Sequence, residues 1–258
     1  MKKLFPFITV LLILYGCPSP KPIQKEEIPE PRITKELLPE MQIRYATIDL
    51  SQYKKKIEKN DLNKFTDQLN KDSIDILTIQ GITRYPALKS RLDIVEELSN
   101  EAGMKNAFGE TINLSGRQNG NGIFTIYPIK SSENLQFENL KSTGFESAIQ
   151  AFVDCGVKEV VIVSTQISEK ATAGDIKNIH TSLRKLFQEY STKPIIISGN
   201  INATEDTLIN VIPNEDHKSP TVWFTKNNSL KLINEQTVQT IFGKMKIINF
   251  GIFREIQR

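Results

Sequence analysis

"PIIISGNINAT", residues 194–204, is the stretch of sequence that decides most about the fold. Its run of three isoleucines is typical of a buried strand. The strand runs into a polar tip formed by Gly199, Asn200, Ile201 and Asn202. Glycine and asparagine often make plain turns, but the ends of strands also carry functional side chains. The tip is therefore either a turn or one corner of a functional site.

The residues before this strand alternate between strand and helix patterns. Residues 41–50 (MQIRYATIDL) and 73–80 (SIDILTIQ) predict two strands. Apolar residues at near-helical spacing predict a helix over residues 53–70, and Pro86 can open another that extends to Ala102. A third helix is predicted over residues 173–190, directly before the strand quoted above.

The middle and the end of the chain read as short strands separated by Gly, Asn and Ser. These strands are predicted at residues 104–111, 122–130, 134–141, 146–154, 159–168, 221–224, 230–233, 238–242 and 246–253. Two β–α units thus precede a run of strands, another α–β unit and more strands, an order that favours mixed sheets over a purely parallel sheet. We expect an α/β (α+β) fold: a four-layer sandwich in which two central mixed β-sheets are flanked by helices.

The N-terminal residues have the features of a bacterial export signal. Lys2 and Lys3 precede the mostly apolar run Leu4–Leu14, which is too short to span a bilayer and suits the core of a signal peptide. The sequence LYGC at residues 14–17 resembles the bacterial lipobox, and this resemblance implies cleavage before Cys17 and lipidation of its thiol. The alternative is an ordinary signal peptide that contains a cysteine.

This interpretation divides the chain into three parts. Residues 1–16 are the expected lipoprotein signal peptide, and residues 17–40 are the expected lipidated cysteine and proline-rich tether. The tether holds half of the 12 prolines of the chain, which cannot join the interior of a regular helix or sheet. Residues 41–258 form one domain that is long enough for a substantial core. We expect the protein in the bacterial cell envelope, lipid-anchored to a membrane, with the domain outside the cytoplasm.

Charge and cysteine content narrow the possible functions. The chain has 33 Lys and Arg against 30 Asp and Glu, and removing Lys2 and Lys3 leaves 31 against 30. Nucleic acid is not supported as a partner by this charge, because a nucleic-acid-binding protein usually shows a basic surplus or patch. The run KKK at residues 54–56 is expected to be a solvated helix face. With Cys17 assigned to lipid, Cys155 has no disulfide partner, and core packing is its favoured role.

The ends of four predicted strands form an ordered set of short motifs. They read ATID at 46–49, TIQG at 78–81, STQI at 164–167 and SGNIN at 198–202. The set resembles the endonuclease/exonuclease/phosphatase (deoxyribonuclease-I-like) family, whose corresponding strands end in Ala-Thr-x-Asn, Gln-Glu, Thr-His and Gly-Asp-Phe-Asn. GNGIFTIYPI at 120–129 is also similar to the Gly-x-Ala-Ile-x-Ser-x-x-Pro-Ile strand of that family. The likeness covers nearly the whole predicted domain.

The resemblance implies a site for metal-dependent phosphoester hydrolysis at these strand ends. Such a site needs carboxylates for a metal, a carboxylate to orient water and a histidine to share a proton. This sequence departs from the family at most of these positions: Asp49 replaces Asn, Gly81 replaces the metal-binding Glu after the retained Gln80, Gln166 replaces His, and Asn200 replaces Asp, while Asn202 is retained. IINFGIFREI, residues 247–256, stands where the family has Ser-Asp-His.

The two histidines of the chain do not fill the missing position. His217, in EDHKSP at residues 215–220, superficially resembles the Asp-His pair but precedes strands that this pair should follow. We expect His217 in an exposed loop. His180 lies beside the apolar stripe of the third predicted helix, where a partly buried structural role is favoured.

The favoured function is therefore that of a pseudoenzyme: a phosphoesterase-like domain that has lost catalysis and serves a binding or scaffold role. It would need no cofactor, and its partners would be the membrane through the lipid on Cys17 and an unknown ligand or envelope protein. The former catalytic cleft would be lined by Asp49, Gln80, Gln166, Asn200 and Asn202.

Two other functions remain open. The first is an active metal-dependent phosphodiesterase or nuclease with a rearranged site, in which Asp49 together with Glu146, Glu205 or Asp206 holds Mg or Mn. The second is an unrelated structural envelope lipoprotein in which the motifs are coincidental. A fold without two stacked sheets would favour this last alternative.

Overall fold

The computed structural model describes residues 39–86, 91–137, 140, 146–201, 207–213, 220–227 and 229–253. The chain divides into two units, Met1–Leu37 and Leu38–Arg258, and the described residues all belong to the second. Cys17 and the predicted signal peptide lie outside the described residues, so the structure does not test them. Among the described helices, none is long and apolar enough to cross a membrane.

The described residues form two six-stranded sheets. In the first sheet the order is β11 (Leu230–Thr240), β12 (Gly243–Ile252), β1 (Met41–Asp49), β2 (Ile76–Arg84), β4 (Arg117–Thr125) and β3 (Lys105–Leu114). In the second it is β5 (Ile129–Leu135), β6 (Ser147–Asp154), β7 (Glu159–Gln166), β8 (Ile195–Gly199), β10 (Thr221–Thr225) and β9 (Ile209–Ile212). Each sheet is mixed, because β1 and β2 pair in parallel, as do β7 and β8, whereas the other pairs are antiparallel.

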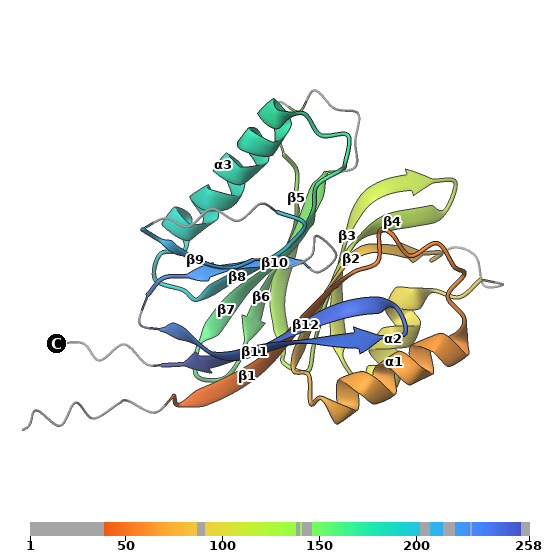
Figure 1. The fold of residues 1–258 in the computed structure, drawn as a ribbon, viewed down its shortest axis with the longest axis horizontal. Coiled ribbons are helices and arrows are strands. Elements are labelled where there is room, and N and C mark those ends of the chain that lie inside the picture. The colour runs from red at the N-terminus through yellow and green to blue at the C-terminus, as the bar shows by residue number, and fades with distance from the viewer. Residues whose placement is uncertain are drawn as a thin grey trace, which may run out of the picture. The chain divides into compact units, whose positions relative to one another are not determined.

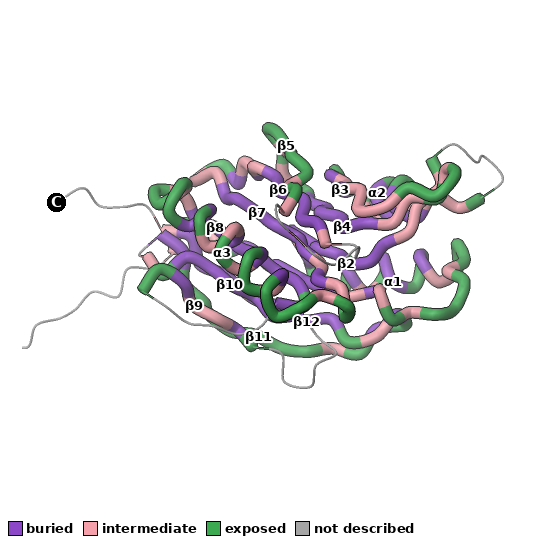
Figure 2. Tube along the Cα trace, turned by 90° about the horizontal axis from the view of Figure 1, so that it is seen from above, coloured by how far each residue is buried: buried purple, intermediate pink, exposed green. Residues whose placement is uncertain are grey.

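The helices cover the outer faces of the two sheets (Figure 1). Helices α1 (Lys59–Lys71) and α2 (Ile94–Ala102) lie on the first sheet, and α3 (Ala173–Glu189) lies on the second. Hydrophobic clusters fill the three spaces that this arrangement creates in the described part of the domain: between the sheets, under α1 and α2, and under α3. The buried residues accordingly lie mostly in the inner strands, whereas the edge strands β5 and β11 and the connecting loops are largely exposed (Figure 2). The predicted four-layer sandwich is confirmed.

The predicted buried strand at residues 195–199 is also confirmed. All five residues of β8 are buried, and its neighbours are β7 on one side and β10 on the other. Its isoleucines alternate between two cores: Ile196 contributes to the core between the sheets, while Ile195 and Ile197 contribute to the core under α3. A strand between two apolar layers has no polar face, which explains the uninterrupted apolar run.

Two helices begin later than the sequence predicts. The helix predicted from residue 53 begins at Lys59, where the Asp61 carboxylate accepts a hydrogen bond from the Glu58 backbone N–H. The helix predicted from Pro86 begins at Ile94, because Asp93 caps it by accepting hydrogen bonds from the next backbone N–H groups. Residues 87–90 lie outside the described residues.

Several strand boundaries also differ from the predictions. The strand predicted at 122–130 is split, since β4 ends at Thr125 and β5 begins at Ile129. Of the strand predicted at 134–141, the first two residues belong to β5, and residues 138, 139 and 141 lie outside the described residues. The two strands predicted at 230–233 and 238–242 are one strand, β11, with a register shift between Leu232 and Asn234. The short strand β9 was not predicted from the sequence.

Candidate functional site

The structure brings together the ends of the four strands that carry the motifs. The parallel pairing places Asp49 opposite Gln80 in the first sheet and Thr165 opposite Gly199 in the second. The two sheets then meet through side chains: the Gln80 Nε2 group donates a hydrogen bond of 2.9 Å to the Ser164 Oγ. The order of motifs in the sequence therefore corresponds to one region at one end of the sandwich.

A buried polar network fills the space between these strand ends. Gln80 Nε2 also lies 3.3 Å from the Ser198 Oγ, and the Ser198 Oγ lies 2.7 Å from the Thr78 Oγ1, which in turn contacts the Tyr45 hydroxyl at 2.8 Å. The side chains of Tyr45, Thr78, Gln80, Ser164 and Ser198 are fully buried. Burial raises the pKa of Tyr45 well above its usual range, so its hydroxyl stays protonated. Gln80 therefore does not line an open cleft, as the sequence-based hypothesis assumed, but joins the two sheets.

Gly81 occupies a position where a side chain does not fit. Its φ of +67° lies in the left-handed region, at a register shift between β2 and β4. A Cβ atom built on Gly81 would lie 2.7 Å from both the Cα and the backbone N of Ser51. The loop that follows β1 thus fills the place where the resemblance puts the metal-binding Glu. Replacing this Gly by Glu would require both a different backbone conformation and a different loop.

The carboxylate of Asp49 is engaged in holding the same loop. Asp49 Oδ1 accepts a hydrogen bond of 2.8 Å from the Ser51 backbone N–H, and the Leu50 backbone N–H donates to the carbonyl oxygen of Gln80 at 2.8 Å. Burial raises the pKa of Asp49, although the bond from Ser51 acts in the opposite direction. Because the pKa is raised in the folded state, this group favours folding most when it is protonated, and that contribution is lost as the pH rises through the raised pKa.

The polar tip of β8 is a structural clamp. The side-chain Oδ1 of Asn200 accepts a hydrogen bond of 2.6 Å from the Ile167 backbone N–H, and its Nδ2 donates to the Ile167 carbonyl oxygen at 2.5 Å. The amide thereby pairs with the end of β7 as a neighbouring strand would. Gly199 allows this approach, because a Cβ atom there would lie 2.1 Å from the carbonyl oxygen of Thr165. Both hydrogen-bonding ends of the Asn200 side chain are used internally.

The remaining predicted site residues lie at the ends of strands β6 and β7 or outside the described residues. Gln166 is half-buried at the end of β7, and no described residue forms a hydrogen bond with its side chain. Glu146 is also half-buried and precedes β6. Asn202, Glu205, Asp206 and His217 lie outside the described residues. The described part of the chain contains no group of three or more His, Cys, Asp or Glu that could hold a metal ion.

The last strand differs from the family pattern in its geometry as well as its sequence. Asn249 lies in the interior of β12, opposite Arg44, and its Nδ2 donates to the Asn234 Oδ1 at 2.8 Å. Phe250 is buried in the core between the sheets, with its ring 6.2 Å from that of Tyr45. These residues hold β12 in place and bring neither an acid nor a base to the strand ends.

Sequence reasoning missed one charged residue near the strand ends. Lys246 is only 3% exposed, and its Nζ donates to the carbonyl oxygen of Pro213, which follows β9 of the opposite sheet. Its register partner is Thr47, whose hydroxyl lies 3.4 Å from the Gln80 Oε1. The available signal in the sequence was the position of Lys246 directly before the apolar residues Ile247 and Ile248, in a predicted strand.

Cys155 and His180 occupy the structural environments expected for them. Cys155 is buried in the core between the sheets, and burial raises the pKa of its thiol to about 12, which keeps it from being a reactive thiolate. The His180 ring on α3 lies 5.2 Å from the Trp223 ring, edge to face, and burial together with Arg184 lowers the pKa of this histidine. Neither residue lies at the strand ends described above.

Comparison with solved structures supports the fold. The chain is similar to an endonuclease/exonuclease/phosphatase from Bacteroides vulgatus, with a TM-score of 0.64 and 11% identity over 82% of this chain and 99% of that chain. It is similar to an endonuclease/exonuclease/phosphatase from Beutenbergia cavernae DSM 12333, with a TM-score of 0.62 and 12% identity over 82% of this chain and 72% of that one. The human Nocturnin catalytic domain gives a TM-score of 0.60 and 15% identity over 83% and 94%.

These likenesses confirm the expected endonuclease/exonuclease/phosphatase-like fold and, at such low identities, show the fold alone. No protein-family model and no curated protein matches the sequence. Proteins of this fold are typically metal-dependent, and the residues at the described strand ends do not fit a divalent cation. Asp49 is half-buried and bound to Ser51, and Gly81 offers no ligand.

A substitution at Gly81 tests whether the loop fills the site. We expect Gly81→Ala to destabilise the domain Leu38–Arg258 more than Gly103→Ala, by at least about 1 kcal/mol, because overpacking costs about 1–3 kcal/mol. Gly103 is the matched control: its φ of +62° is nearly the same, but a Cβ atom there would meet nothing within 4 Å. Urea unfolding measures both, and equal losses would show that Ser51 does not obstruct a side chain at residue 81.

A second substitution tests the clamp at Asn200. Asn200→Asp removes the N–H that donates to Ile167 and places a carboxylate against a carbonyl oxygen, so we expect a loss of about 1–3 kcal/mol at pH 7. Asn227→Asp is the control, because Asn227 Oδ1 only accepts, from Ser229, while its buried Nδ2 has no partner among the described residues. We expect that variant to be neutral or stabilised in urea unfolding. A neutral Asn200→Asp would mean that the clamp does not contribute to stability.

Proposed function

We propose that the protein is a membrane-anchored bacterial lipoprotein whose endonuclease/exonuclease/phosphatase-like domain has lost phosphoester hydrolysis and serves a binding or scaffold role. One observation carries the loss of catalysis: the backbone of Ser51 lies 2.7 Å from where a Cβ atom of residue 81 would be. The position at which the resemblance places the metal-binding Glu is thus closed by the loop as well as empty of a carboxylate.

The other catalytic roles also lack a residue at the described strand ends. Hydrolysis needs a group that moves a proton near neutral pH, and the amides of Gln166 and Asn200 do not ionise there. Asn200 is further committed to the backbone of Ile167, and Gln80 to the serines of the second sheet. The ends of the strands therefore work as an internal joint between the sheets. This supports a domain that keeps the fold of a phosphoesterase without its chemistry.

A hydrolysis assay tests this proposal. The domain Leu38–Arg258 is incubated with bis-p-nitrophenyl phosphate and p-nitrophenyl phosphate in the presence of Mg²⁺ or Mn²⁺, alongside Asp49→Ala. We expect no metal-dependent release of nitrophenol by either protein. Metal-dependent turnover by the natural sequence that Asp49→Ala abolishes would overturn the proposal. It would point instead to a rearranged site in which Asp49 and another carboxylate hold the metal.

The anchoring part of the proposal rests on the N-terminal sequence. The basic start, the apolar run Leu4–Leu14 and the Gly16–Cys17 pair together resemble a lipoprotein signal. The proline-rich residues that follow would act as a semi-extended tether between the lipid and the domain. Cys155 is buried in the domain, which leaves Cys17 as the cysteine that lipid would modify.

Replacing each cysteine in turn tests the anchor. In a bacterial host fed with labelled palmitate, we expect the full chain and Cys155→Ser to incorporate label and to sediment with membranes. We expect Cys17→Ser to lose both properties, because the thiol that accepts the lipid is gone. Membrane sedimentation and label that persist in Cys17→Ser would contradict lipidation at this residue.

A further inference from the structure

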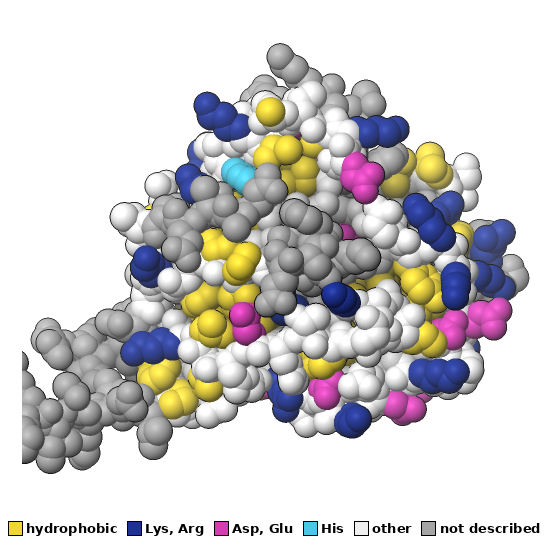
Figure 3. Space-filling model, in the orientation of Figure 1, with side chains coloured by type: hydrophobic (Ala, Val, Ile, Leu, Met, Phe, Trp, Pro, Cys, Tyr) yellow, Lys and Arg dark blue, Asp and Glu magenta, His cyan; other side chains and the backbone are white. Residues whose placement is uncertain are grey.

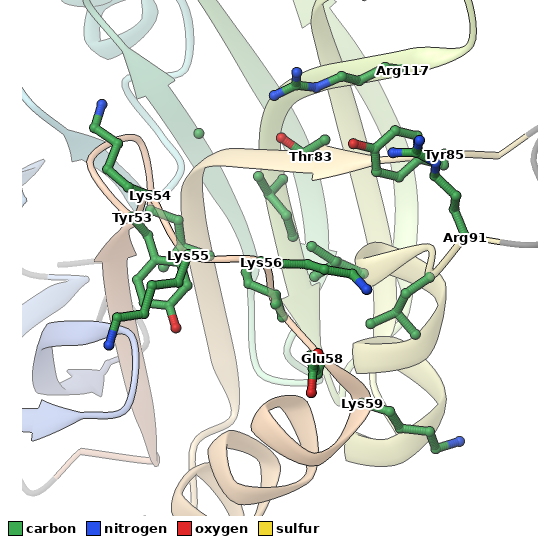
Figure 4. A pocket seen from close by; sticks show the side chains of 16 residues that line it. Tyr53, Lys54, Lys55, Lys56, Glu58, Lys59, Thr83, Tyr85, Arg91 and Arg117 are labelled. Atoms are coloured by element: carbon green, nitrogen blue, oxygen red, sulfur yellow. The ribbon is translucent and has the colours of Figure 1, made fainter.

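A pocket of about 850 Å³ lies beside the strand ends, on the α1 and α2 side of the first sheet. Its walls come from the loop between β1 and α1, the end of β2, the start of α2 and Arg117 at the start of β4 (Figure 4). We call it the basic pocket, after Lys54, Lys55, Lys56, Arg91 and Arg117, which line it. Its floor belongs to the hydrophobic core under α1 and α2, whereas the polar network at the strand ends lies between the sheets.

The five cations of the basic pocket have no counter-ions in the described part of the chain. None of them forms an ion pair with a described carboxylate. Lys59, which also lines the pocket, differs from them because its ammonium group is paired with Glu97 and Glu101 of α2. Glu58 is the one acidic residue among the described lining residues. All five side chains are exposed, so an anion that enters the pocket can pair with them.

Three segments that are distant in the sequence supply these cations. Residues 54–56 form part of the loop before α1 and not of a helix, which corrects that part of the expectation, but their side chains are exposed as expected. In Figure 4 the Lys56 side chain extends across the pocket toward the side where Arg91 and Tyr85 lie, and Arg117 reaches in above Thr83. The corresponding side of the domain shows several Lys and Arg side chains with hydrophobic side chains between them (Figure 3). Lys56, Arg91 and Arg117 thus approach the pocket from three segments, whereas the ammonium groups of Lys54 and Lys55 point away from these three side chains.

The pocket also offers apolar and aromatic surface. Its floor includes Ile57, Ile82 and Ile94, which belong to the core under α1 and α2. Two tyrosines line it: the Tyr53 ring packs edge to face on Phe242 at 5.3 Å, and the guanidinium of Arg91 lies 5.0 Å from the centre of the Tyr85 ring. The contact with Tyr85 favours the orientation in which the guanidinium group lies over this ring.

We propose that the basic pocket binds a small organic anion in which two or more negative charges, as in a phosphate ester, are joined to an aromatic or apolar group. This inference rests on the proposed function, in that the protein holds the ligand without hydrolysing it. The volume lies within the range of about 300–1,000 Å³ that is usual for small-molecule sites. The cations would pair with the negative charges of such a ligand, and the tyrosines and isoleucines would contact its aromatic or apolar group.

The form of the site favours a free ligand over a membrane surface or a nucleic acid. A membrane or a nucleic acid would be contacted through an extended basic face, whereas these cations line one pocket together with tyrosines and isoleucines.

A fluorescent nucleotide, trinitrophenyl-ATP, is the probe for this proposal, because it joins a triphosphate to aromatic rings. It is titrated against the domain Leu38–Arg258, which contains all three described hydrophobic cores and is therefore expected to fold without the preceding residues. We expect saturable binding that the triple variant Lys56→Gln, Arg91→Gln and Arg117→Gln weakens at least tenfold. The matched control, Lys170→Gln, Lys177→Gln and Lys185→Gln, replaces three exposed lysines at and near α3 and should change the affinity less than twofold.

Competing ligands identify the chemistry that the pocket recognises. We expect unlabelled ATP to displace the probe better than inorganic triphosphate, because the triphosphate lacks the ring. Phosphatidylglycerol vesicles test a lipid headgroup as the source of the phosphate, and a 12-nucleotide DNA strand tests a polymer. The proposal is overturned if the probe does not bind, if the pocket and control variants lose affinity equally, or if vesicles or DNA bind more tightly than ATP and lose this binding in the pocket variant.

Hydrolysis of bis-p-nitrophenyl phosphate with Mg²⁺ or Mn²⁺ is measured on the same protein samples to separate the two proposals. Binding of the probe without release of nitrophenol supports both of them. Metal-dependent release of nitrophenol by the natural domain would overturn the loss of catalysis while leaving the binding pocket established. Absence of binding together with absence of release would overturn the pocket and leave the proposed loss of catalysis intact.

Discussion

The arrangement of the strand ends depends on the hydrogen bonds that the side-chain amide of Gln80 donates. This amide leaves the first sheet and donates to two serines of the second, Ser164 and Ser198, in a space from which water is excluded. A buried amide has a large desolvation cost unless its hydrogen bonds are made, so the two sheets must meet in one register at this end. The neighbouring features follow from that register: the turn at Gly81, the loop that packs against it, and the approach of β7 and β8 that Asn200 closes.

Neutral side chains at these strand ends change the physical character of the site. Several carboxylates placed together repel one another unless a metal ion neutralises them, and such a site is strained when the metal is absent. Amides and hydroxyls in the same space pair with one another and with the backbone instead. Here Asn200 satisfies both the N–H and the carbonyl of Ile167, which a carboxylate could not do. The side chains at the strand ends therefore satisfy their hydrogen bonds within the protein. This agrees with the general observation that high stability of a site and the strain needed for catalysis oppose each other.

The sequence was sufficient for the fold but not for the geometry of the site. The isoleucines at 195–197 and the ordered motifs at four strand ends indicated two sheets, because strand pattern and motif order are local or linear properties of the chain. The conformation of Gly81 depends on the backbone of Ser51, 30 residues earlier, and no pattern in the sequence records that contact. Helix α2 begins at Ile94 because Asp93 caps it. The apolar residues at helical spacing before Asp93 predicted an earlier start. The basic pocket could not be predicted because its cations come from three separate segments that only the fold brings together.

One loop connects the strand ends around Gly81 to the basic pocket. Asp49 holds the Ser51 N–H, the Leu50 N–H is held by Gln80, and the Tyr53 N–H donates to the carbonyl of Leu50. These bonds fix the start of the segment that carries Lys54 to Lys56 into the pocket wall. The absence of a side chain at Gly81 is what allows this path, since a Cβ atom there would collide with Ser51. The glycine at residue 81 therefore leaves the room that this loop needs to bring Lys54 to Lys56 to the wall of the basic pocket.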